Sequence, residues 1–136
     1  MAPRVADYLD HACQARPANC GAFLCGWVEV LTGRHPMPGV EDMAVRDWAR
    51  HVRNKGGMEA VCSELAVQSG FRQIDADDAR EGDAAVVMSP THPTRRRLRE
   101  TLAIAVGPAP RFAVMAGPFV QVSSYQPLAA WRLADG

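Results

Sequence analysis

The sequence has no excess of charge of either sign, because 15 Lys and Arg residues balance 15 Asp and Glu residues. Without a basic field, nothing in the composition favours binding to nucleic acid or to an anionic membrane surface. The chain also lacks an apolar run near the roughly 20 residues that a membrane-spanning helix requires. We therefore expect no nucleic-acid partner and no membrane span, and any recognition by charge has to be local.

Cysteine is scarce as well, and the four cysteines show none of the paired spacings of a structural zinc site. Four is also a low number for a secreted scaffold held by disulfides. Residues 1–31 contain no charged segment, apolar segment and cleavage site in the order of a secretory signal. We expect reduced thiols, no metal, no cofactor, and synthesis in the cytoplasm without a signal peptide.

The apolar content is sufficient for a core, since 48% of the 136 residues are hydrophobic and 22% are charged. A chain of this size is typical of one domain. Helical periodicity extends over about residues 3–70, and short strand-like runs follow over about 71–133. Helices followed by strands predict a single domain, 1–136, of the α+β class.

Four helices are predicted, over 3–13, between Asn19 and Gly33, over 40–55, and from Met58 to an end at Gly70. The second opens with a good N-cap residue, closes at a glycine and carries no charge before Glu29. A helix that is apolar nearly all round is typically buried. We therefore expect the second helix to lie at the centre of the domain.

Glycine and tryptophan positions predict where the helices are packed most closely. Gly21 and Gly26 lie inside the second helix, where each costs about 1 kcal/mol relative to Ala. Both therefore indicate close approach by a neighbouring element. Trp27 and Trp48 fall on apolar stripes and are predicted to be core residues. Trp131, in the C-terminal LAAWRL segment, is predicted to pack back onto the domain.

Four strand-like runs are predicted, over 82–88, 101–106, 111–115 and 119–122. Short strands at this close spacing, with Gly-Pro turns between the later ones, predict a small and strongly bent antiparallel sheet. A Pro-containing loop from Ser89 to Glu100 separates the first two runs.

This loop concentrates four arginines, namely Arg95, Arg96, Arg97 and Arg99. Guanidinium groups in such a cluster could clamp a carboxylate or phosphate, or contact an acidic partner. The alternative is a solvated hairpin tip, because charged runs are usually just exposed. Aromatic residues are not interleaved with the arginines, which weakens a nucleic-acid interpretation.

Cys20 is the residue most suggestive of chemistry, because it follows Asn19 at the start of an apolar helix. Free N–H groups and the helix dipole at this place lower the pKa of a thiol. The alternative is packing, since Cys20, Phe23, Leu24 and Trp27 recur at helical spacing and free cysteines are among the most buried residues. Spacing alone leaves both interpretations open.

Four segments then occur in a meaningful order: NCGAFLCGWVEVLTG around Cys20, EGDAAVV, TLAIAVG and the C-terminal LAAWRL. Together they resemble the NlpC-like branch of the papain-like cysteine peptidases, which cleave peptide bonds in bacterial cell walls. The closer resemblance, over about Pro17 to Leu133, is to small proteins of phage and prophage tail modules. It implies a papain-like fold with a buried Cys helix on a small antiparallel sheet, Cys20 as the nucleophile position, and other tail proteins of the tip or hub as partners.

The sequence departs from the family at the position of the catalytic base. In the family's HVGIYVG strand the first residue is the catalytic His, and here Thr101 has that place. Threonine cannot take a proton from a thiol at neutral pH, and residues 112–116 offer no group to orient a base. A cysteine nucleophile needs a base within hydrogen-bond reach. His92, in the loop before Thr101, is the one histidine that could replace it, although loop histidines are ordinarily solvated.

Three functional hypotheses follow. The first is a structural virion protein of a phage or prophage tail, with a degenerate NlpC-like peptidase fold and no hydrolytic chemistry. The second is an active cysteine-dependent peptidoglycan endopeptidase or amidase, with Cys20 and His92, that aids penetration of the cell wall. The third is a cytosolic interaction module that binds acidic ligands through the arginine loop.

Overall fold

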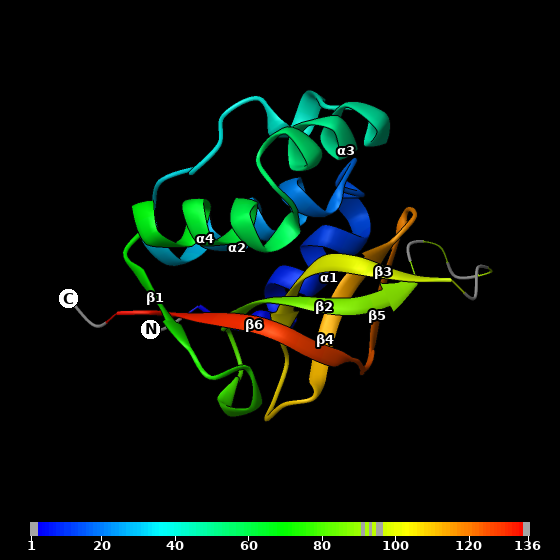
Figure 1. Ribbon diagram of the computed structural model, residues 1–136. Helices are drawn as coiled ribbons and strands as arrows, with labels where there is room; N and C mark the ends of the chain where they lie inside the picture. The colour runs from blue at the N-terminus through cyan, green and yellow to red at the C-terminus, as the bar shows by residue number, and fades with distance from the viewer. Residues whose placement is uncertain (1–2, 91, 93, 95–96, 135–136) are drawn as a thin grey trace.

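The computed structural model describes residues 3–90, 92, 94 and 97–134. Its helices are α1 (Val5–Ala15), α2 (Cys20–Thr32), η1 (Val40–Asp42), α3 (Val45–Asn54), α4 (Met58–Gln68) and η2 (Ala76–Asp78). Its strands are β1 (Phe71–Ile74), β2 (Ala84–Pro90), β3 (Leu98–Ala105), β4 (Arg111–Ala116), β5 (Phe119–Ser124) and β6 (Gln126–Leu133). The long helices precede the strands along the chain, so the predicted α+β class is confirmed (Figure 1).

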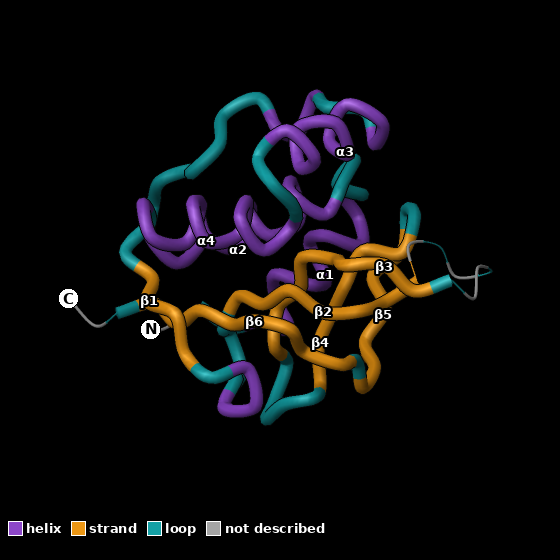
Figure 2. Tube along the Cα trace, in the orientation of Figure 1, coloured by secondary structure: helices purple, strands orange, loops and turns teal. Residues whose placement is uncertain are grey.

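The strands form one antiparallel sheet in the order β1-β6-β2-β3-β4-β5. Helices α2 and α4 lie on one face of it (Figure 2). Val86, Leu102 and Trp131 point toward these helices and belong to the main core. The alternate residues Val87 and Phe112 belong to a second, smaller core on the other face. The central strands of the sheet are therefore buried on both faces.

Helix α2 begins and ends where the sequence indicates. The Asn19 Oδ1 atom accepts a hydrogen bond from the Ala22 N–H at 2.7 Å and so caps the first turn. Gly33 ends the helix with φ of 78°, and its N–H donates to the Glu29 carbonyl oxygen at 2.7 Å. Trp27 is 1% exposed. The predicted burial of this helix is confirmed.

The two interior glycines of α2 make room for aromatic side chains. A Cβ atom on Gly21 would overlap the indole of Trp48 from α3, and one on Gly26 would overlap the Tyr8 hydroxyl from α1. That hydroxyl donates to the Phe23 carbonyl oxygen at 2.6 Å. The predicted close approach is confirmed, and side chains on both flanking helices provide it.

The single helix predicted over 40–55 is wrong, because the chain is extended at Met43 and Ala44, between η1 and α3. The cause is a long-range contact. The Asn19 Nδ2 group donates to the carbonyl oxygens of Val40, at 2.9 Å, and Met43, at 3.1 Å. The Val40 carbonyl oxygen also accepts from the Met43 N–H at 3.2 Å, which closes η1, and the chain is extended at Met43 and Ala44 before the helix restarts at Val45.

The strand predictions need three corrections. Strands β1 and β6 were not predicted. Strand β2 ends at Pro90 and β3 begins at Leu98 rather than at Thr101, so both ends of the loop predicted over 89–100 are strand. Trp131 is fully buried, which confirms that the C-terminal segment packs onto the domain. Strand β6 contains a proline and small residues with low strand propensity, and it forms because it pairs with both β1 and β2. A register shift opposite Val86 and Val87 accommodates the proline.

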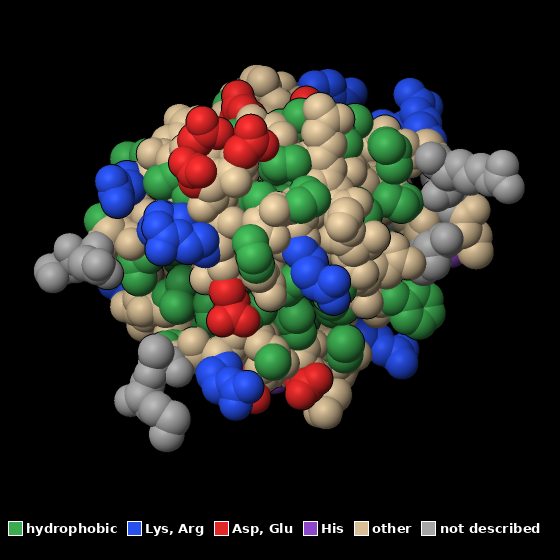
Figure 3. Space-filling view, turned by 90° about the horizontal axis from the view of Figure 1, so that it is seen from below, with side chains coloured by type: hydrophobic (Ala, Val, Ile, Leu, Met, Phe, Trp, Pro, Cys, Tyr) green, Lys and Arg blue, Asp and Glu red, His purple; other side chains and the backbone are tan. Residues whose placement is uncertain are grey.

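The surface opposite the helices shows no field of one sign. Basic, acidic and hydrophobic side chains are interspersed on it, and one group of acidic side chains stands apart (Figure 3). Among the described residues, no helix has the length and apolar character needed to cross a bilayer.

The two roles of Asn19 can be separated by substitution. We expect Asn19→Ala to lower the free energy of unfolding by about 2–4 kcal/mol, because it removes the cap and leaves buried carbonyls without donors. Asn19→Ser keeps a capping oxygen and should lose about 1–2 kcal/mol. Urea unfolding followed by circular dichroism measures both, with the exposed Asn54→Ala as the control. Equal losses for Ala and Ser would show that the cap contributes nothing.

Candidate functional site

A cleft of about 730 Å³ opens where the start of α2, the inner face of α3, the beginning of β3 and the end of β4 meet. The described residues that line it are Ala18, Asn19, Cys20, Val45, Trp48, Ala49, Val52, Arg53, Gly57, Met58, Arg99, Glu100, Thr101, Met115 and Gly117. Its size is that of a ligand site, and its walls are mainly apolar with charged groups added. The sequence-predicted Cys20, Arg99 and Thr101 are brought together here.

The half-buried Cys20 thiol lies in this cleft and has a raised pKa. Burial is the largest influence on it and raises its pKa above the ordinary value. The Leu102 N–H from β3, the nearby Trp48 indole, and the N–H groups of Cys20 and Gly21 act in the opposite direction without reversing the shift. The Trp48 Nε1 atom is buried and makes no hydrogen bond of standard geometry to a described residue. The helix start therefore does not yield a thiolate at neutral pH.

Thr101 shares the cleft with Cys20, but its hydroxyl is committed elsewhere. It accepts a hydrogen bond from the buried Ser89 hydroxyl at 2.9 Å and donates to the Arg99 carbonyl oxygen at 3.1 Å. Thr101 is the cross-strand partner of Val87, so its side chain lies on the sheet face of the second core. The alternate residue Glu100 carries its side chain on the face toward α2. Thr101 therefore offers no base to the thiol.

His92 lies close to the cleft without lining it. Its ring is beside Gly117, where an added Cβ would be 3.0 Å from Cδ2. Its Nδ1 atom accepts from the Thr94 N–H at 3.2 Å and is 2.9 Å from the Thr94 hydroxyl oxygen. His92 is thus engaged in a local turn, and Nε2 is the nitrogen that remains for another partner.

Of the other histidines and the loop arginines, Arg99 alone is among the described residues that line the cleft. None of His11, His35 and His51 is among the residues that line the cleft, and His51 stacks on Trp48 with ring centroids 5.7 Å apart. Of the four predicted loop arginines, Arg99 lines the cleft and Arg97 is exposed. Arg95 and Arg96 lie outside the described residues, so their predicted partner contact remains a prediction.

Sequence analysis missed the wall that α3 provides. Val45, Trp48, Ala49 and Val52 recur at helical spacing and face the cleft, and Arg53 stands at its edge. Of these residues the sequence analysis predicts Trp48 as a core residue, which is confirmed, since it is 4% exposed. Val45 is 65% exposed. Two features of the α3 sequence could have indicated this wall. The helix has more basic than acidic residues, and its apolar stripe includes the small residue Ala49.

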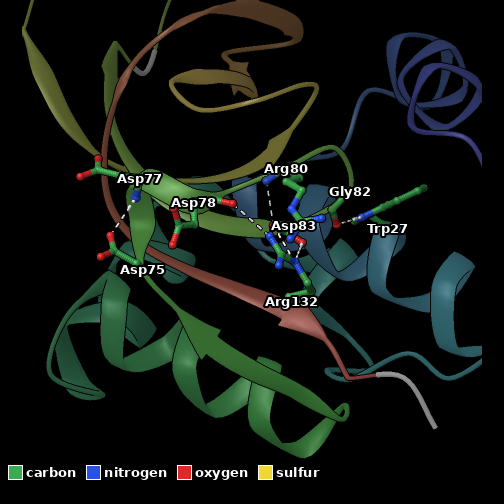
Figure 4. Close-up of polar contacts among 8 residues, drawn as sticks. All are labelled: Trp27, Asp75, Asp77, Asp78, Arg80, Gly82, Asp83 and Arg132. Atoms are coloured by element: carbon green, nitrogen blue, oxygen red, sulfur yellow. Dashed lines mark hydrogen bonds and ion pairs between the residues drawn. The ribbon is translucent and has the colours of Figure 1, made fainter.

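A second cleft, of about 340 Å³, lies beside a network that serves structure (Figure 4). The buried Asp83 carboxylate accepts from the Arg132 guanidinium, with the shortest contact at 2.8 Å, and from the Arg80 N–H at 2.8 Å. The Trp27 indole donates to the Gly82 carbonyl oxygen at 2.8 Å. This network joins three parts of the chain, namely α2, the turn that precedes β2, and strand β6. The segments EGDAAVV and LAAWRL are therefore in direct contact through Asp83 and Arg132.

Within the described residues, no group of three or more His, Cys, Asp or Glu side chains is arranged to hold a metal ion. Cys13, Cys20, Cys25 and Cys62 are all free thiols. The chemistry available in the large cleft is therefore that of a protonated thiol, one carboxylate, two guanidinium groups and apolar surface.

Comparison with protein-family models, with curated proteins and with solved structures finds no match to this chain in any of the three. The papain-like, NlpC-like architecture and the link to phage tails therefore depend on the resemblance of short motifs. The α+β fold with its antiparallel sheet is what the structure establishes.

The Asp83 network should be sensitive to the shape of its cationic partner. We expect Arg132→Ala to cost about 1–3 kcal/mol of unfolding free energy, because the Asp83 side chain, 6% exposed, loses its main partner. Arg132→Lys should recover part of this loss only, since an ammonium cannot reproduce the two-pronged contact. Arg72→Ala, at the cross-strand neighbour of Arg132, is the matched control and should change stability by less than about 0.5 kcal/mol.

Cys20 should react as a half-buried thiol whose pKa is raised. Because burial raises its pKa, the thiolate forms only at high pH, and alkylation by iodoacetamide should still be accelerating above pH of about 8.5. At pH 7 the exposed Cys13 should be labelled first, and Cys25, whose pKa burial raises to about 12, among the last. Peptide mass spectrometry measures all four sites in one sample. Rapid labelling of Cys20 well below that pH would instead reveal a base beside the thiol.

Proposed function

We propose that this chain is a structural protein of a phage or prophage tail, in which an NlpC-like, papain-like peptidase fold is kept without peptidase chemistry. It would act in the virion, at the tail tip or during tail assembly, with other tail proteins as partners. The tail context comes from the motif resemblance, and the loss of chemistry is argued from the cleft.

The observation that carries the proposal is the absence of an imidazole from the described lining of the Cys20 cleft. At the position of the family's His, Thr101 is hydrogen-bonded to Ser89 and to the Arg99 carbonyl. The third position of a triad is also unfilled, since Met115 is what β4 contributes to the cleft. A thiol that is protonated at neutral pH and has no adjacent base is a poor nucleophile.

One observation keeps the peptidoglycan hydrolase as the second candidate. The His92 ring contacts Gly117, and Gly117 lines the Cys20 cleft. In this alternative a movement of the loop would bring His92 Nε2 to the thiol. The two candidates differ in whether Cys20 and His92 are required.

Genetic complementation of tail formation separates the candidates. In a lysogen that carries the gene, we expect its deletion to abolish tailed particles in electron micrographs of induced lysates. Cys20→Ala should restore both particle number and infectivity to within about twofold, because a residue in a retired site is needed for packing only. Asn19→Ala, which weakens the fold and leaves the thiol in place, is the matched control and should restore fewer particles.

The remaining outcomes would contradict the proposal. Normal particles after deletion would exclude a structural role in the tail. Complete but non-infectious particles with Cys20→Ala and with His92→Ala would favour the hydrolase instead. Purified protein incubated with peptidoglycan then provides the direct assay, in which release of soluble fragments that requires Cys20 would establish hydrolysis.

A further inference from the structure

Among the described residues, the part of β3 that borders the Cys20 cleft has no strand partner on one edge. Residues Leu98 to Ile104 of β3 pair with β2, but its pairing with β4 is limited to Ile104 and Ala105. Along β3 the backbone groups alternate: the Ala105 N–H donates toward β2, to Asp83, and the Val106 N–H donates to Arg111 beside β4. Residues separated by an even number of positions direct their backbone groups to the same side, so Glu100, like Val106, directs its N–H and C=O away from β2. Glu100 is exposed and lines the cleft, so this edge of β3 borders it.

The wall opposite this edge is an apolar face of α3. Val45 and Ala49 are exposed on it, and Val52 continues the face toward α4. Exposed apolar groups along a cleft of this size are a feature of binding sites. An extended peptide beside β3 would place alternate side chains against this face.

The charges around the cleft select the kind of peptide. The chain is neutral as a whole, yet α3 carries Arg46, Arg50 and Arg53 against one acid, Asp47. Arg53 lines the cleft from α3, and Arg99 lines it from β3, where strand alternation starts its side chain on the same face as Thr101. Neither makes an ion pair with a described residue. Guanidinium groups without partners are suited to carboxylates. Glu100 supplies the only carboxylate among the described residues of the lining.

We propose that an acidic segment of a partner protein docks in the Cys20 cleft in extended form. Its backbone pairs with the free edge of β3 at Glu100, its apolar side chains cover the face of α3, and its carboxylates bind Arg53 and Arg99. The proposal rests on the proposed function in one respect, namely that a cleft without catalysis is available for a permanent partner.

The test uses a random octapeptide library selected on the wild-type protein, followed by fluorescence anisotropy of the recovered peptides. We expect the selected sequences to alternate Asp or Glu with apolar residues. Arg53→Glu and Arg99→Glu should each weaken binding by about fivefold to tenfold, because attraction becomes repulsion at the edge of the site. Arg50→Glu, on the same helix but outside the lining, is the matched control and should change binding by less than about twofold.

Backbone methylation tests the strand pairing without altering the protein. Two versions of one peptide carry N-methyl groups on its odd or on its even residues. We expect one version to lose at least about tenfold in affinity and the other to retain it, because an edge pairs with alternate N–H groups only. Equal sensitivity of the two versions, or of neither, would overturn the pairing with β3.

Other results would overturn the proposal as a whole. These are a library without binders, peptides that bind equally well after Glu is replaced by Lys, and binding that neither arginine substitution weakens. Equal binding of a single-stranded oligonucleotide would show a general preference for polyanions instead. Peptide binding is also measured for Cys20→Ala by fluorescence anisotropy. Because this assay uses purified protein and does not depend on tail formation, a failure of the docking proposal can be distinguished from a failure of the tail proposal.

Discussion

The buried side chain of Asn19 is the contact on which the arrangement of the helices depends. Its oxygen caps α2 and its amide group binds the carbonyl oxygens of Val40 and Met43, so one side chain fixes the start of one helix and the end of another. An amide is suited to this place because it offers an acceptor and two donors at once. Since Cys20 follows directly in the chain, its position relative to α3 is set by the same bonds.

The position of α3 determines the character of the cleft. Trp48 lies on Gly21, where no larger residue would fit, and this contact brings the indole next to the Cys20 thiol. Removal of the thiol from water raises its pKa more than the neighbouring N–H groups lower it. The packing that holds the helices together therefore also keeps the thiol neutral, and a neutral thiol behaves as a small apolar group.

The features predicted correctly from the sequence are those encoded by neighbouring residues. The ends of α2 follow from Asn19 and Gly33, each of which acts within its own turn. The break before α3 could not be predicted, because the bonds that cause it join residues 21 and 24 positions apart. Strands β1 and β6 likewise form through each other, from opposite ends of the sheet-forming part of the chain. For the site, Cys20 was found by its place at a helix start, whereas the direction of Thr101 depends on strand register, in which one residue reverses the face.

The same geometry connects the absence of a base from the described lining of the Cys20 cleft with the capacity to bind a peptide. A catalytic cleft needs a base beside the thiol and room for a reacting group, and here the Thr101 hydroxyl is directed to the other face of the sheet. What remains is an apolar wall, an unpaired backbone edge at Glu100 and two arginines without partners among the described residues. Unpaired strand edges are usually protected in folded proteins, since they invite pairing with other chains. An edge that borders a cleft and is flanked by charge limits that pairing to a segment of matching shape and charge, which is how such a cleft can become a specific contact.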